Sequence, residues 1–118
     1  MMSNSEFKKA LDATHELEIT VTGRKSGRAI SLPVWFVREG DTLYLLPVKG
    51  SDTNWYQNVL KTPTMNISAQ GAKITAKAKS ITDRTQVNEV AEKFRAKYGA
   101  GEVKKYYSKF DACVEISL

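Results

Sequence analysis

A short cationic segment bounded by two glycines is the first place in this chain where chemistry is expected. Residues 22–28 read Thr-Gly-Arg-Lys-Ser-Gly-Arg. Glycines let backbone N–H groups converge on an oxygen, cations attract negative charge, and a serine adds a neutral donor. We therefore expect Arg24, Lys25 and Ser26 to bind an anion such as a phosphate group. The spacing is not that of a Walker A loop, and the alternative is that the segment is only a solvated hairpin tip.

Two downstream segments and one aromatic residue extend this candidate site. Lys49 and Gly50 precede a run of turn-forming residues, and Trp55 and Tyr56 open a short helical stretch. Trp35 lies two residues after Pro33, which lacks an N–H and suggests a strand edge or a bulge. Because bulges redirect side chains and are common near active sites, we expect Trp35 to face a pocket, with packing in the core as the alternative.

Neither metal binding nor a disulfide is indicated by the sequence. The single histidine, His15, and the single cysteine, Cys113, lie far apart and provide no spaced ligand cluster. One cysteine cannot form an internal disulfide, which is compatible with a reducing compartment. No apolar run approaches the ~20 residues needed to cross a bilayer, and the polar residues 1–9 lack the apolar core of a signal peptide. The sequence therefore predicts a cytoplasmic protein with no membrane span.

The chain length and charge distribution favour one domain with an anionic partner. A chain of 118 residues can bury a core without disulfides, so we expect a single domain over residues 1–118. The formal net charge of +5 is concentrated between Arg24 and Lys79, where nine basic residues face three acidic ones. A positive field there attracts a polyanion, either nucleic acid or a phosphorylated cofactor.

Hydrophobic periodicity predicts about six strands joined mostly by hairpins. Strand patterns occupy residues 17–22, 30–37, 42–48, 65–69, 74–79 and 112–118. Helical spacing occupies residues 7–14, 55–61, 83–98 and 103–110. The long helix has the strongest signals, because Asp83 and Gln86 form a capping box and Gly99 follows its end. This order predicts a mainly β protein with helices, built as a closed or partly closed antiparallel barrel.

Three finer expectations follow from these patterns. The run at residues 42–48 is apolar on both faces and is expected to be a central strand. Asp52, Thr53 or Asn54 is expected to cap the helix that follows. A row of lysines at positions 73, 77 and 79 is either a solvated outer face or half of an anion groove.

Five ordered segments resemble the deazaflavin-dependent nitroreductase family. They are Thr22–Gly27, Leu32–Val37, Leu43–Leu45, Val48–Gly50 and Trp55–Pro63, and the resemblance covers about residues 20–69. That family belongs to the flavin-binding split β-barrel superfamily, which also contains the pyridoxamine phosphate oxidase-like proteins. The resemblance implies an antiparallel split β-barrel of about six strands with flanking helices, commonly paired as a homodimer.

The resemblance also implies an oxidoreductase that passes a hydride from a reduced deazaflavin coenzyme (F-420) to a small organic acceptor such as a quinone or nitro compound. In the family, the segment matching Arg24, Lys25 and Ser26 binds the phosphate side of the cofactor. The segment that here is Val48–Gly50 lies along the ring, and the helix that here begins with Trp55 and Tyr56 shapes the pocket.

This chain departs from the family pattern at three places. Ile30 stands where many relatives carry a second basic residue, and Val48 stands where serine is usual. The loop at residues 51–54 is also shorter than typical. These departures leave FMN open as the alternative cofactor.

A cofactor that carries the hydride chemistry removes the need for a catalytic dyad in the protein. Lys49 or a nearby backbone N–H is expected to stabilise negative charge on the reduced ring. Where the acceptor needs a proton, Tyr56, Tyr106 or Tyr107 is a candidate donor, and solvent is the alternative. These tyrosines otherwise pack their rings and expose their hydroxyls to water.

Two rival functions remain at this point. The first keeps the same fold but binds FMN, haem or another tetrapyrrole as a carrier or sensor. The second is a barrel that binds single-stranded nucleic acid, with Trp35, Tyr44 and Trp55 as a stacking platform beside the basic residues. The second function explains the lysines but not the order of the five segments.

Overall fold

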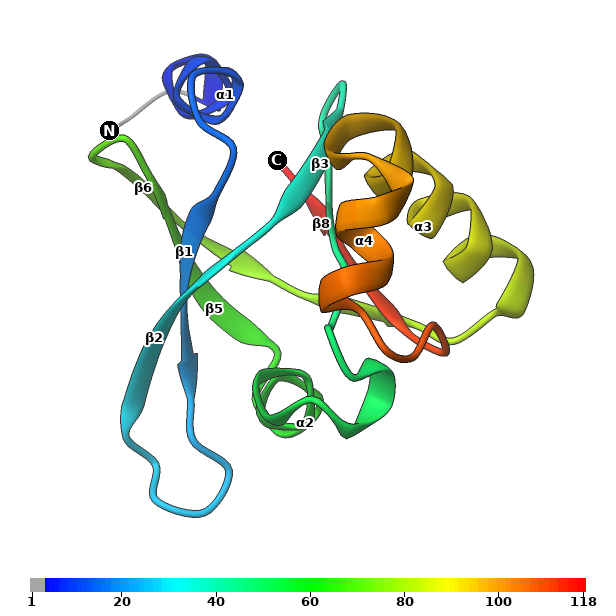
Figure 1. Ribbon diagram of the computed structural model, residues 1–118. Coiled ribbons are helices and arrows are strands. Elements are labelled where there is room, and N and C mark those ends of the chain that lie inside the picture. The colour runs from blue at the N-terminus through cyan, green and yellow to red at the C-terminus, as the bar shows by residue number, and fades with distance from the viewer. Residues whose placement is uncertain (1–3) are drawn as a thin grey trace.

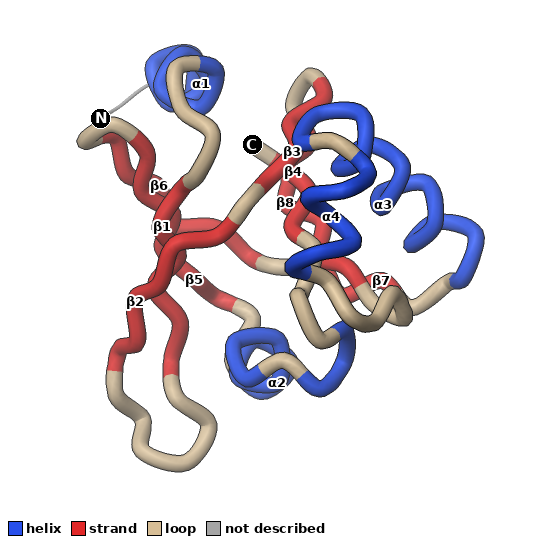
Figure 2. Tube along the Cα trace, viewed as in Figure 1, coloured by secondary structure: helices blue, strands red, loops and turns tan. Residues whose placement is uncertain are grey.

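The computed structural model describes residues 4–118, and within them the chain forms two four-stranded antiparallel sheets surrounded by helices (Figures 1 and 2). The first sheet has the order β2-β1-β5-β6 and the second has the order β3-β4-β8-β7. The strands are β1 (Leu17–Thr22), β2 (Ala29–Val34), β3 (Phe36–Glu39), β4 (Thr42–Leu45), β5 (Thr64–Ala69), β6 (Ala72–Lys77), β7 (Lys79–Ile81) and β8 (Cys113–Ser117). The helices are α1 (Asn4–Asp12), the short 3-10 helix η1 (Gly50–Asp52), α2 (Asn54–Lys61), α3 (Arg84–Tyr98) and α4 (Ala100–Tyr106).

Two strands that the sequence predicts as continuous are each divided between the sheets. The pattern at residues 30–37 becomes β2 and β3, which are separated by Trp35, and the pattern from residue 74 onward becomes β6 and β7, which are separated by Ala78. Figure 1 shows β2 running directly into β3 as the chain passes from one sheet to the other. The described residues therefore form eight strands rather than about six, and the barrel is split rather than closed.

The sequence correctly places Pro33 at a sheet edge. Within residues 4–118, β2 pairs with β1 alone, and Pro33 lies opposite Glu18 in that register. A residue without an N–H is tolerated on an edge strand because no second ladder needs its hydrogen bond.

The core lies between the sheets and under the long helix. The inward residues of β1, Leu17, Ile19 and Val21, are buried as their alternation predicts. Helix α3 begins as expected, because the Asp83 carboxylate accepts a hydrogen bond of 3.0 Å from the Gln86 N–H. The apolar stripe of α3 packs on the second sheet, and Figure 1 shows α3 and α4 together on that side.

Several boundaries differ from the sequence expectation. β4 ends at Leu45 rather than residue 48, although it is central as expected, between β3 and β8. The Thr53 residue is the N-cap of α2 but its hydroxyl does not cap the helix, because it accepts a hydrogen bond of 2.8 Å from the Lys49 N–H. The three lysines of β6 and β7 are exposed. None of the helices within residues 4–118 is long and apolar enough to span a membrane.

Candidate functional site

The tip of the β1–β2 hairpin is held against α2 by a buried asparagine. Asn58 Oδ1 accepts hydrogen bonds from the Arg24 N–H at 3.0 Å and from the Arg24 guanidinium at 2.8 Å. The Lys61 ammonium donates to the Arg24 carbonyl oxygen at 2.9 Å. The backbone N–H and the guanidinium of Arg24 therefore already donate hydrogen bonds to α2. Lys25, in contrast, is exposed and has no partner in the described part of the chain.

A cavity of about 340 Å³ opens beside this tip. Its lining includes the three residues predicted to bind an anion, Arg24, Lys25 and Ser26, together with Leu32 and Trp55. The predicted cationic segment thus faces a concave surface.

A larger cavity of about 690 Å³ adjoins the first. The predicted residues on its lining are Trp35, Val48, Lys49, Trp55, Tyr106 and Tyr107. Leu32, Asn54 and Trp55 line both cavities. We call the two cavities together the cleft, with a cationic end at Arg24 and Lys25 and an aromatic end at Trp35.

The aromatic end is fixed by a tyrosine that the sequence did not identify as a site residue. Tyr98 stacks on Trp35 with ring centroids 4.2 Å apart and an interplanar angle of 8°. Its hydroxyl donates to the His15 carbonyl oxygen at 2.6 Å and accepts from the Phe36 N–H at 3.2 Å. Burial raises the pKa of Tyr98 to about 12, so the hydroxyl stays protonated at neutral pH. Tyr106 meets the same indole edge-on at 5.5 Å.

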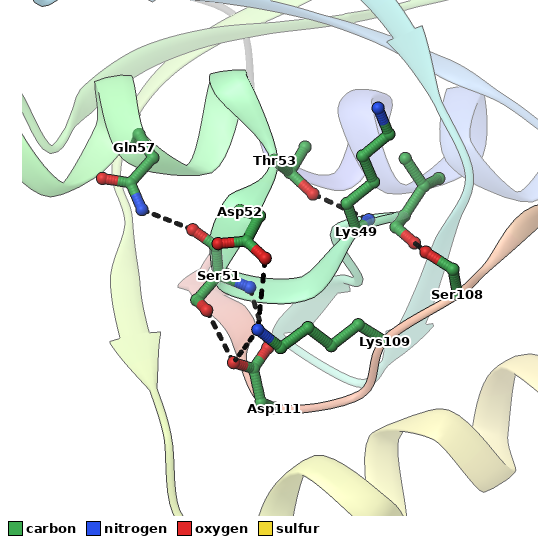
Figure 3. Close-up of polar contacts among 9 residues, drawn as sticks. Lys49, Ser51, Asp52, Thr53, Gln57, Ser108, Lys109 and Asp111 are labelled. Carbon is green, nitrogen blue, oxygen red and sulfur yellow. Dashed lines mark hydrogen bonds and ion pairs between the residues drawn. The ribbon is translucent and has the colours of Figure 1, made fainter.

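The wall that carries Lys49 is tied to the segment before β8 by a polar cluster (Figure 3). Asp111 accepts hydrogen bonds from the Ser51 N–H at 2.8 Å and from the Ser51 hydroxyl at 2.6 Å. Lys109 forms an ion pair with Asp52 at 3.2 Å and approaches Asp111 at 3.6 Å. We call these four residues the clamp. The Ser51 hydrogen bonds hold the pKa of Asp111 below its ordinary value, with a smaller contribution from Lys109 and opposition from burial.

The clamp leaves the Lys49 side chain free to face the cleft. Figure 3 shows its ammonium directed away from the carboxylates of Asp52 and Asp111. Its backbone is held on both sides, because the Lys49 N–H donates to the Thr53 hydroxyl oxygen at 2.8 Å and the Lys49 carbonyl oxygen accepts from the Asp52 N–H at 3.1 Å. Lys49 is therefore a cation on a fixed backbone.

Residues 8–112 match a protein family described as "Uncharacterized protein conserved in bacteria (DUF2255)". The chain belongs to this family. No curated protein matches it.

Several solved structures share the fold at low sequence identity. An F420-H2 dependent reductase is 19% identical, with 87% of this chain and 94% of that one covered at a TM-score of 0.67. A proposed pyridoxamine 5′-phosphate oxidase from Listeria innocua is 13% identical over 95% and 90% of the two chains, at a TM-score of 0.69. HutZ, the heme storage protein from Vibrio cholerae, is 14% identical over 99% and 90%, at a TM-score of 0.71. The chain therefore has the split β-barrel fold.

Two of the predicted site residues do not reach the cleft. Tyr56 is 1% exposed and its hydroxyl is hydrogen-bonded to the Ser80 hydroxyl, so this side chain packs in the core. Gly50 is buried behind the wall at a φ of 55°, where a Cβ would lie 2.1 Å from Asp111 Oδ1. Gly50 is thus required by the clamp and does not line the cleft.

Asn58, Asn54 and Glu16 are among the residues of the cleft that the sequence analysis did not predict as site residues. Asn58 was hidden because a polar residue in a short amphipathic helix is usually exposed, yet it is 4% exposed. Asn54 was considered only as a cap. Glu16, in the segment before β1, lines the aromatic end.

The described residues hold no group of three His, Cys, Asp or Glu side chains that could bind a metal ion.

Proposed function

We propose that this protein is an oxidoreductase that holds a reduced deazaflavin coenzyme in the cleft and passes its hydride to a small organic acceptor, such as a quinone or nitro compound. The observation that carries the proposal is the adjacency of the two cavities, because Leu32 and Trp55 line both the cationic end and the aromatic end. A ligand with a phosphate at one end and a flat ring at the other matches this arrangement. The similar fold of an F420-H2 dependent reductase supports the same class of cofactor.

The cationic end has the donors that a phosphate group requires. Lys25 offers an unpaired ammonium, Ser26 offers a hydroxyl, and the guanidinium of Arg24 adds positive charge. Charge-assisted hydrogen bonds of this kind are about twice as strong as neutral ones. Arg24 is already ordered by Asn58, so little conformational entropy is lost there when an anion binds.

The aromatic end has the properties that a redox-active ring requires. When bound, a reduced deazaflavin supplies a hydride, which is one proton with two electrons. Trp35 and Trp55 provide flat apolar walls that keep water from the ring, and Lys49 provides positive charge beside it. Val48 and Tyr107 complete the lining at this end.

A proton for the acceptor comes from the rim of the cleft or from solvent. Tyr106 is 52% exposed at this rim and can exchange protons with water. Burial raises the pKa of Tyr107, which therefore holds its proton more tightly. Of the two cleft tyrosines, the Tyr106 hydroxyl is the better donor.

The alternative cofactors differ in how well they suit the lining. FMN has a phosphate and a flat ring, so it competes directly with a deazaflavin. Haem usually takes an axial His, Cys, Met or Tyr ligand, and the described lining of the cleft offers only tyrosine among these. Nucleic-acid binding is poorly supported, because the three predicted stacking residues do not share one surface: Trp35 and Trp55 line the larger cavity, whereas Tyr44 is absent from its lining. We propose a homodimer on the basis of the resemblance, and the cytoplasmic location stays an expectation from the sequence.

Fluorescence titration of the purified protein with the reduced deazaflavin coenzyme and with FMN tests the proposal. We expect the deazaflavin to bind more tightly and Lys25→Ala to weaken its binding about 10- to 100-fold, since one charge-assisted contact contributes about 1.5 to 3 kcal/mol. Arg24→Ala combined with Lys25→Ala should weaken it further. The control is Lys73→Ala, which removes the same charge from the exposed face of β6. Equal affinities for the parent and Lys25→Ala would remove the hairpin tip from the site.

A further inference from the structure

Glu16 is an acidic residue that the proposed chemistry does not yet use. Two acidic side chains line the larger cavity, Glu16 and Asp52. Asp52 forms an ion pair with Lys109 at 3.2 Å, and it shares this ammonium with Asp111 at 3.6 Å. No ion pair or side-chain hydrogen bond engages the Glu16 carboxylate within residues 4–118. Glu16 is therefore an exposed carboxylate without a partner in the described residues, on a lining that also carries the ammonium of Lys49.

The backbone of Glu16 is fixed, so its exposed side chain extends from a defined position on the lining of the larger cavity. The Thr14 hydroxyl donates to the Glu16 carbonyl oxygen at 2.9 Å, and the same hydroxyl oxygen accepts from the Glu16 N–H at 3.4 Å. The preceding carbonyl, of His15, accepts from the Tyr98 hydroxyl. Because Tyr98 also stacks on Trp35, one tyrosine holds both the turn with Glu16 and the indole at that end.

The cleft is consequently polarised along its length. Lys25 and Arg24 lie at one end, Lys49 lies on the wall of the larger cavity, and Glu16 lies at the end with Trp35. A phosphorylated cofactor oriented by the cations would leave the region near Glu16 for the second substrate. Opposite charges attract more strongly in a partly desolvated cleft than in bulk water.

We propose that Glu16 selects the acceptor, favouring cationic or hydrogen-bond-donating molecules and disfavouring anionic ones. This inference rests on the proposed function, because it names the class of acceptor for the same cleft. One charge at a separation of about 6 to 8 Å, at the effective dielectric of a partly exposed site, changes the binding of a singly charged acceptor about 3- to 10-fold.

The local potential at Trp35 is measurable without any cofactor. In a Trp55→Phe background, Trp35 is the remaining tryptophan, and its quenching by iodide and by caesium reports the charge around the indole. We expect Glu16→Gln to increase the iodide quenching constant and to decrease the caesium constant. The matched control is Glu18→Gln, which removes the same charge two residues away, from an exposed position outside the cleft. If Glu16→Gln and Glu18→Gln give the same ratio of constants as the parent, Glu16 does not set this potential and the inference fails.

Steady-state kinetics then test directly whether Glu16 selects the acceptor. The steady-state kcat/KM is measured with the reduced deazaflavin coenzyme for a cationic and an anionic quinone of similar size and potential. Because loss of Glu16 lowers the value for the cation and raises the value for the anion, we expect Glu16→Gln to shift the ratio of the two values about 10- to 100-fold toward the anionic quinone, and Glu18→Gln to leave it unchanged. An unchanged ratio in Glu16→Gln overturns the role in selection even if the quenching responds. If the parent protein reduces neither quinone, the proposed function is wrong. The role of Glu16 in acceptor selection then fails as well, whatever the quenching shows.

Discussion

The clamp makes a specific prediction about the stability of the wall that carries Lys49. Asp111→Ala removes the acceptor of two Ser51 hydrogen bonds, at 2.8 and 2.6 Å, and one partner of Lys109. The change leaves the N–H of the half-buried Ser51 without a hydrogen-bond acceptor. We therefore expect a larger effect than for the loss of an ordinary surface ion pair.

The size of the effect follows from the number of bonds and their exposure. A hydrogen bond to a charged group contributes about 1.5 to 3 kcal/mol. The Asp111 side chain is 39% exposed, so water replaces part of the lost interaction and the lower value applies to each bond. The free energy of unfolding should fall by about 2 to 3 kcal/mol.

Urea unfolding followed by far-UV circular dichroism measures this loss. Asp52→Asn is the matched control, because it removes the Lys109 ion pair from the same loop and leaves the Ser51 bonds intact. Amide hydrogen exchange at residues 49–53 should speed up in Asp111→Ala and remain near the parent value in Asp52→Asn. Equal losses of stability in the two variants would show that the Ser51 hydrogen bonds contribute nothing beyond the ion pair of Lys109, and this reasoning would be wrong.

The pH dependence gives an independent check on the same carboxylate. The folded pKa of Asp111 is lowered, mainly by the Ser51 hydroxyl, so its contribution is fully present above the unfolded pKa of about 3.9. The contribution is lost as the pH falls through the folded pKa. The difference in unfolding free energy between the parent and Asp111→Ala should therefore shrink below about pH 4 and stay constant from pH 5 to 8. A difference that shrinks on the alkaline side would contradict this origin.

Two further substitutions test the packing behind each end of the cleft. Gly50→Ala should destabilise the protein by more than about 2 kcal/mol, because Gly50 has a φ of 55° and its new Cβ would lie 2.1 Å from Asp111 Oδ1. In an Asp111→Ala background the same change should have a smaller effect in urea unfolding, and additive losses would argue against the contact. Tyr98→Phe keeps the ring on Trp35 but removes the hydroxyl bonds, so stability should fall by about 1 kcal/mol while the emission maximum of Trp35 in the Trp55→Phe background is retained. A large shift of that maximum would show that the hydroxyl, rather than the ring stack, positions the indole.

The sequence predicts most elements of this fold because their signals are local. The alternation in β1 and the capping box at Asp83 each depend on residues within one element. The division of residues 30–37 into β2 and β3 has no such signal, because apolar alternation continues across Trp35. Which sheet each half joins depends on pairing with Leu17–Thr22 and with Thr42–Leu45, and pairing between distant segments is not encoded in periodicity.

The candidate site was predictable to the same extent. Arg24, Lys25 and Ser26 stand out by residue type and spacing, and the structure places them on one cavity. The clamp joins Ser51 to Asp111, 60 residues further along the chain, so no local pattern could reveal it. Tyr98 is the last residue of the helix predicted at residues 83–98, and its role beside Trp35 depends on the packing of that helix against the junction of β2 and β3.

The split between the sheets is what creates the larger cavity. β2 and β3 are both edge strands, so Trp35 between them belongs to neither hydrogen-bonded ladder and its indole can turn toward the space beside the sheets. The opposite wall comes from the end of β4, where Val48 and Lys49 have left the second sheet, and from α2. A closed barrel would continue both ladders through these positions and fill the same space with side chains. The cleft is therefore built from residues at which regular pairing stops, and their positions depend on long-range contacts made by Tyr98 and Asp111.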